Sequence, residues 1–229
     1  EGLEYHTGAV EKDKEAFTQM IEYPSIINSS KAPRKPMIAF EKLDGSNIRV
    51  KYTEKRGFDL FGSRTQLLDN THPFLGGVVE YFNDNCAEPL TKVFKKEFPN
   101  EREIIVFGEY FGAQSFAGHH VLEDPKKFVM FDVLLGNKDR KFIMPREFIK
   151  LFSNVVEIPR VIHEGNLTDQ FIQDVRDGKY PVVEGVMCKG LEKSGAFRGG
   201  VWMCKIKTKA FFDLLTAKFG VDGIAKYGE

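Results

Sequence analysis

The chain has 229 residues, long enough for one large domain or two small ones, and one domain is the simpler interpretation. Apolar residues make up 42% and charged residues 29%, which excludes a disordered or fibrous chain, and the 33 basic residues match the 33 acidic ones, so a nucleic-acid surface must be a local basic patch. No apolar run approaches the roughly 18 residues of a membrane helix and no basic-then-apolar leader opens the chain, so we expect a cytoplasmic protein without membrane contacts.

Three strands are predicted first. Met37 to Lys42 and Asn47 to Thr53 bracket Asp44-Gly45, a pair suited to a tight turn, so we expect a hairpin. Phe58 to Ser63 extends the same sheet as a third short strand.

A helical pattern follows from His72 to Phe98, and Pro89 is expected to break or kink it into two helices. Glu103 to Tyr110 and Lys127 to Leu135 are rich in β-branched and aromatic residues, which predicts central strands. Pro145 stands at a suitable first position for a further helix.

Near the end, Val182 to Lys189 and Val201 to Thr208 form a second predicted strand pair, and Phe211 to Lys226 is an amphipathic helix. Because strands and helices intermingle, the predicted class is α+β, with antiparallel sheets and helices outside them.

Lys42 shares the strand phase of Ile38 and Phe40, so it should point with them toward an interior or a cleft. Burial and neighbouring cations lower the pKa of a lysine, and the neutral amine is the form that attacks phosphorus. The alternative is a solvated lysine at the hairpin, which this segment taken alone favours.

Lys205 and Lys207 lie on one face of the last predicted strand, together with Met203. Two ammonium groups so placed can hold a phosphate and can help to keep a third lysine neutral. The alternative is an exposed edge strand protected from aggregation by its charges.

Two acids and one aromatic residue complete the candidates. Glu184 precedes Gly185 and could bind a divalent cation, while Glu109 lies in an otherwise apolar strand. Phe131 could stack on a purine. Each has an ordinary alternative: a hydrogen-bonded carboxylate at a strand end, or a core phenylalanine.

Five segments resemble, in order, motifs I, III, IIIa, IV and V of the covalent nucleotidyltransferases, a superfamily of DNA ligases, RNA ligases and mRNA capping enzymes. They are EKLDGSN (Glu41 to Asn47), FGEYFG (Phe107 to Gly112), FVMFDV (Phe128 to Val133), VEGVMCK (Val183 to Lys189) and MCKIKT (Met203 to Thr208). The resemblance implies the fold of that superfamily, with an ATP cleft between antiparallel sheets flanked by helices. It also implies one adenylyltransferase domain over residues 1–229, without a complete C-terminal OB domain.

The resemblance assigns chemistry to these residues. It implies that Lys42 is the nucleophile that forms a lysyl-AMP phosphoramidate with ATP. It further implies that Glu184 acts at a metal, Mg²⁺ or Mn²⁺, and that Lys205 and Lys207 hold the α-phosphate.

The nucleoside half of ATP has its own implied contacts. Glu109 is expected at the ribose, Phe131 on the adenine ring, and Glu41 at the base edge through its backbone and side chain.

Within the superfamily, Asn47 is similar to the RNA ligase 2 group, which includes phage enzymes and kinetoplastid editing ligases, because many DNA ligases and capping enzymes carry arginine there. Ser63-Arg64-Thr65 resembles an arginine segment of that group, which implies that Asn47 and Arg64 contact the nucleotide and that Arg64 also reaches the RNA end. Asp44 departs from the pattern, since that group commonly has histidine at this position.

The function expected from the resemblance is ATP-dependent joining of 3′-hydroxyl and 5′-phosphate ends by a monomer, with nicked or broken RNA favoured over DNA. Lys189 is expected to contact the nucleic-acid backbone. The alternatives are a DNA ligase core, a non-catalytic module that binds nucleic-acid ends, and a capping guanylyltransferase.

Overall fold

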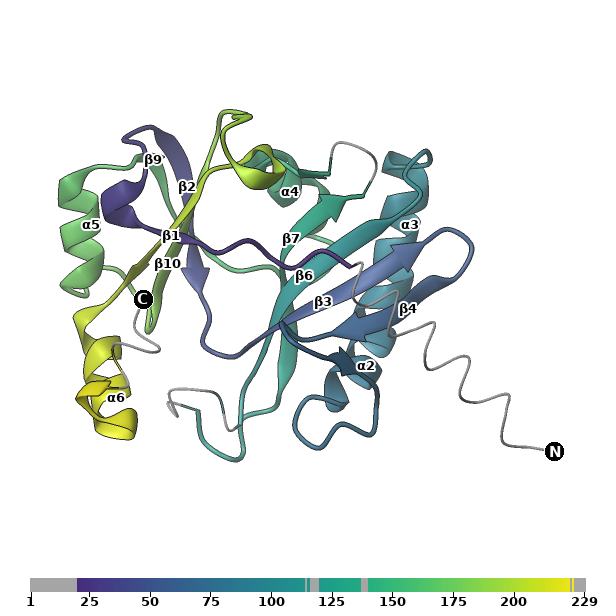
Figure 1. Ribbon diagram of the computed structural model, residues 1–229, viewed down its shortest axis with the longest axis horizontal. Coiled ribbons are helices and arrows are strands. Elements are labelled where there is room, and N and C mark those ends of the chain that lie inside the picture. Colours follow the sequence, from purple (N-terminus) through teal and green to yellow (C-terminus); the bar gives the residue numbers. More distant parts are fainter. Residues whose placement is uncertain (1–19, 114, 116–119, 137–139, 223, 225–229) are drawn as a thin grey trace.

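The computed structural model describes residues 20–113, 115, 120–136, 140–222 and 224, and within them the strands form two sheets that stand next to each other (Figure 1). In order across the first sheet, the five strands are β1 (Ile27–Asn28), β11 (Met203–Lys207), β10 (Gly185–Gly190), β2 (Pro36–Lys42) and β9 (Val161–Asn166). β1 runs parallel to β11, and the other neighbours are antiparallel.

The second sheet is antiparallel throughout. In order, its six strands are β5 (Leu67–Leu68), β4 (Gly57–Gly62), β3 (Ser46–Thr53), β6 (Ile104–Phe111), β7 (Lys127–Leu135) and β8 (Lys141–Phe142). The predicted α+β class with antiparallel sheets is confirmed.

Three helices cover the outer face of the six-stranded sheet. They are α2 (Gly77–Phe82), α3 (Glu88–Glu97) and α4 (Pro145–Phe152). A π-helical turn, Asn83–Ala87, joins α2 to α3 and leaves Pro89 in the first turn of α3. The break expected at the proline takes this form, because Pro has no N–H to donate to the preceding turn.

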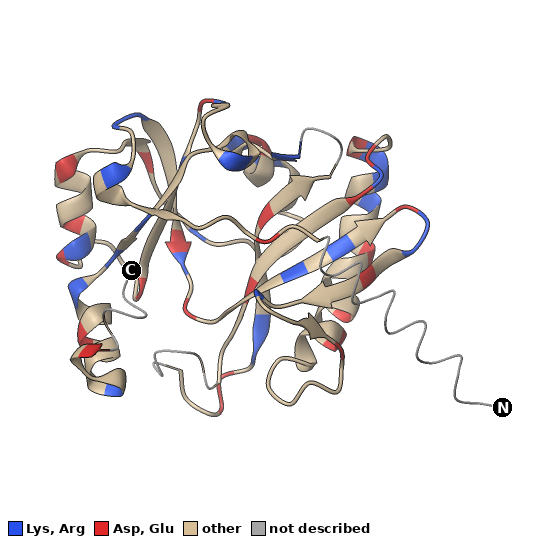
Figure 2. Ribbon diagram, in the orientation of Figure 1, with Lys and Arg blue, Asp and Glu red and all other residues tan. Residues whose placement is uncertain are grey.

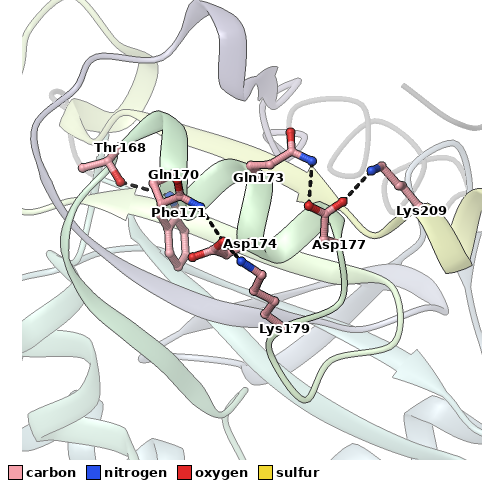
Figure 3. Close-up of polar contacts among 8 residues, drawn as sticks. All are labelled: Thr168, Gln170, Phe171, Gln173, Asp174, Asp177, Lys179 and Lys209. Atoms are coloured by element: carbon pink, nitrogen blue, oxygen red, sulfur yellow. Dashed lines mark hydrogen bonds and ion pairs between the residues drawn. The ribbon is translucent and has the colours of Figure 1, made fainter.

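The other two helices lie at the five-stranded sheet (Figure 1). α5 (Asp169–Arg176) packs Phe171 and Val175 against this sheet, and α6 (Lys209–Phe219) follows β11 directly. The Thr168 hydroxyl caps α5 by accepting from the Phe171 N–H, and an ion pair between Asp177 and Lys209 ties the end of α5 to the start of α6 (Figure 3).

One predicted bound needs correction. α6 ends at Gly220, whose φ of 73° favours glycine, and the expected end at Lys226 lies outside the described residues. β9 and α5 were not predicted.

No helix in the described ranges has the length and hydropathy needed to cross a membrane.

The predicted hairpin at Asp44-Gly45 is wrong, because β2 and β3 belong to different sheets and residues 43–45 cross between them. Asp44 is buried, and a Cβ at Gly45 would lie 2.5 Å from the Tyr110 carbonyl oxygen. The glycine is needed for this close passage along β6 rather than for a tight turn.

A separate hydrophobic cluster holds the two sheets together. Phe107 and Leu134 of the six-stranded sheet pack with Val201 and Met203 on the side away from the helices. Met20, at the start of the described chain, belongs to the same cluster. This cluster joins the inner faces of the two sheets, and the cleft lies beside it.

Candidate active site

A cleft of about 800 Å³ opens between the two sheets. All ten residues predicted for the site line it, namely Glu41, Lys42, Asn47, Arg64, Glu109, Phe131, Glu184, Lys189, Lys205 and Lys207. Basic and acidic residues are interspersed along the ribbon in both sheets (Figure 2).

Strand alternation places the charged centre of the cleft. Phe40 and Lys42 of β2 both line it, which confirms the predicted phase. Gly185 of β10 lies opposite Lys42 on one side and Lys207 of β11 on the other, so the preceding Glu184 reaches both lysines.

The two lysines share one oxygen of the Glu184 carboxylate. Glu184 Oε1 lies 2.8 Å from Lys42 Nζ and 3.7 Å from Lys207 Nζ, and only 5% of the glutamate side chain is exposed. Its other oxygen, Oε2, is buried and has no hydrogen-bond partner within the described part of the chain. A buried carboxylate oxygen without a donor suits a cation ligand.

The pKa of Lys42 contradicts one prediction. Burial lowers this pKa, but the carboxylates of Glu184, Glu109 and Asp44 together outweigh burial, and the pKa lies above its ordinary value of 10.5. The expectation that Lys42 is kept neutral is therefore wrong for this arrangement, in which the ammonium form is favoured. For Lys207 the pKa is lowered, first by burial and then by Lys42 and Lys205.

Glu109 behaves in the opposite way. Burial raises the pKa of Glu109 to about 8, and the charges of Glu184 and Asp44 act in the same direction, against Lys42. The Gly45 N–H donates to its carboxylate. Asn47 of β3 lies directly opposite Glu109 in the sheet, so the two predicted contacts are neighbours.

The other end of the cleft is apolar. Phe40, Phe131, Pro159 and Met187 line it, and Phe131 is the residue expected to stack on the base. An apolar end next to a charged centre can accommodate the base of a nucleotide at one end and its phosphates at the other.

Lys189 lies at the floor of this apolar end, and its position does not fit the expected nucleic-acid contact. Its side chain is 4% exposed, with Nζ 2.7 Å from Asp132 Oδ2 and 5.1 Å from the centre of the Phe40 ring. The Tyr23 hydroxyl donates to the same Asp132 oxygen. The lysine charge is thus used inside the protein, because a buried carboxylate needs a partner.

Comparison with known proteins identifies the family. A family model described as RNA ligase matches residues 35–207, which is most of the chain. The chain belongs to the RNA ligase family. A comparison with curated proteins finds no match.

Solved structures of a Naegleria gruberi RNA ligase share the fold. An arginine-to-alanine mutant with ATP and Mn has a TM-score of 0.63 at 17% identity, over 84% of this chain and 57% of that chain. A mutant with AMP and Mn gives 0.62 at 17%, over 84% and 57%, and the complex with PPi gives 0.61 at 18%, over 86% and 58%. This member of the RNA ligase family spans less than two thirds of the length of those chains.

In this RNA ligase family member, a buried arginine that was not predicted shapes the wall that carries Arg64. Arg49 is 3% exposed and donates to the carbonyl oxygens of Ser63 at 3.1 Å, Met20 at 2.8 Å and Arg64 at 3.3 Å. The detectable signal was a charged residue between Ile48 and Val50 in an apolar strand, where burial requires several acceptors.

A second arginine engages Glu41. Arg160 Nε donates to Glu41 Oε2 over 2.7 Å, and the Glu41 N–H donates to the Arg160 carbonyl oxygen over 2.8 Å. The carboxylate expected at the base edge is therefore already held by a guanidinium. Its partner could not be predicted, because Arg160 lies 119 residues away in the chain.

The segment before β1 was also missed. Residues 23 and 25–28 line the cleft, with Tyr23 in the apolar end and Asn28 opposite Lys205 of β11. A segment of six residues is too short to show a periodicity that a sequence pattern could detect.

Proposed function

We propose that this protein is an ATP-dependent RNA ligase, which joins 3′-hydroxyl and 5′-phosphate ends through AMP carried first on Lys42 and then on the 5′ end. The observation that carries the proposal is that Lys42 and Lys207 both lie close to one oxygen of Glu184. This contact is inside a cleft whose other end is apolar. Family membership and the ATP, AMP and Mn complexes of the Naegleria gruberi enzyme support it.

In the first step, Lys42 Nζ attacks the α-phosphorus of ATP, so that a nitrogen–phosphorus bond forms and pyrophosphate leaves. The amine must lose its proton first, and the Glu184 carboxylate is the strongest influence that keeps it protonated. A cation on Glu184 would weaken this influence and leave burial, which lowers the pKa of Lys42.

The phosphates need positive partners in the same place. In this proposal Lys205 and Lys207, which both line the cleft, hold the α-phosphate and stabilise the charge that develops on its oxygens. A divalent cation, Mg²⁺ or Mn²⁺, would be held by Glu184 through Oε2 and would supply further charge neutralisation. No cluster of three His, Cys, Asp or Glu side chains occurs among the described residues, which fits a metal completed by phosphate oxygens.

The nucleoside is held by the rest of the cleft. Phe131 stacks on the adenine, and Glu41 presents its main chain to the base edge while Arg160 holds its carboxylate. Glu109 and its neighbour Asn47 contact the ribose.

Two later steps follow on the nucleic acid. AMP moves from Lys42 to the 5′-phosphate, and the 3′-hydroxyl then displaces AMP as the phosphodiester forms. In this proposal Arg64, which lines the cleft and whose carbonyl oxygen accepts from Arg49, holds the RNA end. These transfers require alignment and charge neutralisation more than acid-base chemistry.

Labelling with α-³²P-ATP or α-³²P-GTP and Mg²⁺ tests the proposal, followed by a chase with nicked duplexes whose 3′-hydroxyl strand is RNA or DNA. We expect label from ATP on the wild type and on Lys51→Ala, and no label on Lys42→Ala. Lys51 is the matched control, because its side chain is 18% exposed against 22% for Lys42 and it also pairs with a glutamate.

Each other outcome points to one alternative. Preferred sealing of DNA indicates a DNA ligase core, and label from GTP indicates a capping guanylyltransferase. A wild type that takes up no label refutes the enzyme and leaves a module that binds nucleic-acid ends.

A further inference from the structure

An exposed aromatic ring stands at the rim of the cleft on a tightly folded turn. Phe74 is 69% exposed, whereas the next residue, Leu75, lines the cleft. Burial of its ring would be favourable, so an exposure this large on one aromatic side chain marks a contact surface when other features support it.

The turn that carries Phe74 is held by hydrogen bonds. His72 Nδ1 accepts from the backbone N–H groups of Phe74 at 3.3 Å and Leu75 at 3.1 Å. A Cβ at Gly76 would lie 2.6 Å from the His72 carbonyl oxygen, so the backbone here is closely packed. The ring is therefore presented by a fixed backbone and not by a loose loop.

The same histidine ties the turn to the cleft wall. The side chains of His72 and Gln66 are in contact through nitrogen atoms 2.8 Å apart, and Gln66 lines the cleft beside Arg64. The turn and the wall next to Arg64 thus form one unit.

A cation completes the surface. Lys126 Nζ donates to the Phe74 carbonyl oxygen over 3.2 Å and lies 5.8 Å from the centre of the Tyr110 ring. An exposed aromatic ring with an ammonium group at its own backbone carbonyl is a combination that suits a nucleobase together with its phosphate.

We propose that Phe74 and Lys126 form a subsite outside the nucleotide cleft, in which an unpaired base of the RNA substrate stacks on the Phe74 ring while its phosphate contacts Lys126. The subsite deepens the proposed RNA ligase function and rests on it for the choice of RNA. It would hold a strand near the Arg64 side of the cleft, and it takes no part in the reaction of Lys42 with ATP.

Binding of a fluorescent, 5′-phosphorylated RNA by anisotropy tests the subsite without any need for sealing. We expect Phe74→Ala to weaken binding about tenfold and Phe74→Trp to retain it, because stacking depends on an aromatic face. Lys126→Ala should reduce the salt slope of binding by about 0.7, since one phosphate contact is lost from a single strand. Labelling of Lys42 by ATP should be unchanged in all three variants.

A set of RNAs with a single abasic nucleotide at successive positions locates the base. At one position the loss of the base and Phe74→Ala should not add, because each removes the same contact. Val161→Ala is the matched control, since this side chain is an exposed apolar residue away from the turn.

The proposal is overturned if Phe74→Ala binds RNA as well as Val161→Ala, or if every abasic position adds its full loss to that of Phe74→Ala. These results are independent of the proposed ligase activity, whose failure appears instead as a wild type that takes no label from ATP.

Discussion

Glu184 offers the sharpest test of the electrostatics of the site. Its Oε1 lies 2.8 Å from Lys42 Nζ and 3.7 Å from Lys207 Nζ. Glu184→Gln would remove the negative charge while keeping the shape of the side chain. Two ammonium groups would then face each other without their shared anion. Breaking a buried ion pair from one side costs about 3–5 kcal/mol. We expect the lower end, about 3 kcal/mol, because Lys42 is 22% exposed and Glu109 can ionise to compensate in part.

The assay is urea unfolding, supported by thermal unfolding, in which this loss lowers Tm by roughly 6–12 °C. Without the anion, the lysines have a lower pKa in the folded state than in the unfolded state. The unfolded state then binds more protons, so the stability of the variant rises as pH increases. The difference in free energy of unfolding between the wild type and Glu184→Gln should therefore become smaller from pH 7 toward pH 9.5.

The matched control is Glu192→Gln, which removes the partner of Lys35 at 3.1 Å where both side chains are more than half exposed. An exposed pair of this kind contributes less than about 1 kcal/mol. Equal losses in the two variants, or a difference that does not change with pH, would refute the shared-anion account.

Two further predictions concern stability. Because the pKa of Glu109 is about 8 in the folded protein against an ordinary 4.5, the folded state holds a proton that the unfolded state releases. The stability of the wild type relative to Glu109→Gln should therefore fall by about 2–3 kcal/mol between pH 5.5 and 7.5, and an unchanged difference in urea titrations would contradict this. Gly185→Ala should lower the free energy of unfolding by more than about 3 kcal/mol, because the new Cβ would lie 1.9 Å from the Ile206 carbonyl oxygen at a φ of 154°. The control is Gly57→Ala, which has open space at a φ of 67° and should lower it by about 1 kcal/mol. Denaturant midpoints measure both losses.

The features that depend on local alternation could be predicted from the sequence. Phe40 with Lys42, and Lys205 with Lys207, lie on the cleft faces of their strands as their spacing requires. The period of two fixes which side chains share a face, whatever sheet the strand joins.

The features that depend on distant partners could not be predicted. Asp44-Gly45 fits a hairpin and a crossing between sheets equally well, and only the close approach to Tyr110 distinguishes them. Lys189 has the face expected of a cleft residue, but its burial depends on Asp132, which lies in the other sheet. The raised pKa of Lys42 likewise depends on carboxylates from three different segments.

The pairing of β1 with β11 determines when the cleft can form during synthesis. Ile27 lies beside Cys204, and the Tyr23 hydroxyl oxygen lies 3.1 Å from Met203 Sδ, across 180 residues of chain. The ribosome adds about 5–20 residues per second, and the last strand of the six-stranded sheet ends at residue 142, well before β11 is made. We therefore expect the nascent chain to pair the strands of that sheet first and to leave Ile27 and Asn28 without a strand partner until β11 emerges, so that the cleft is complete only when synthesis has passed residue 207.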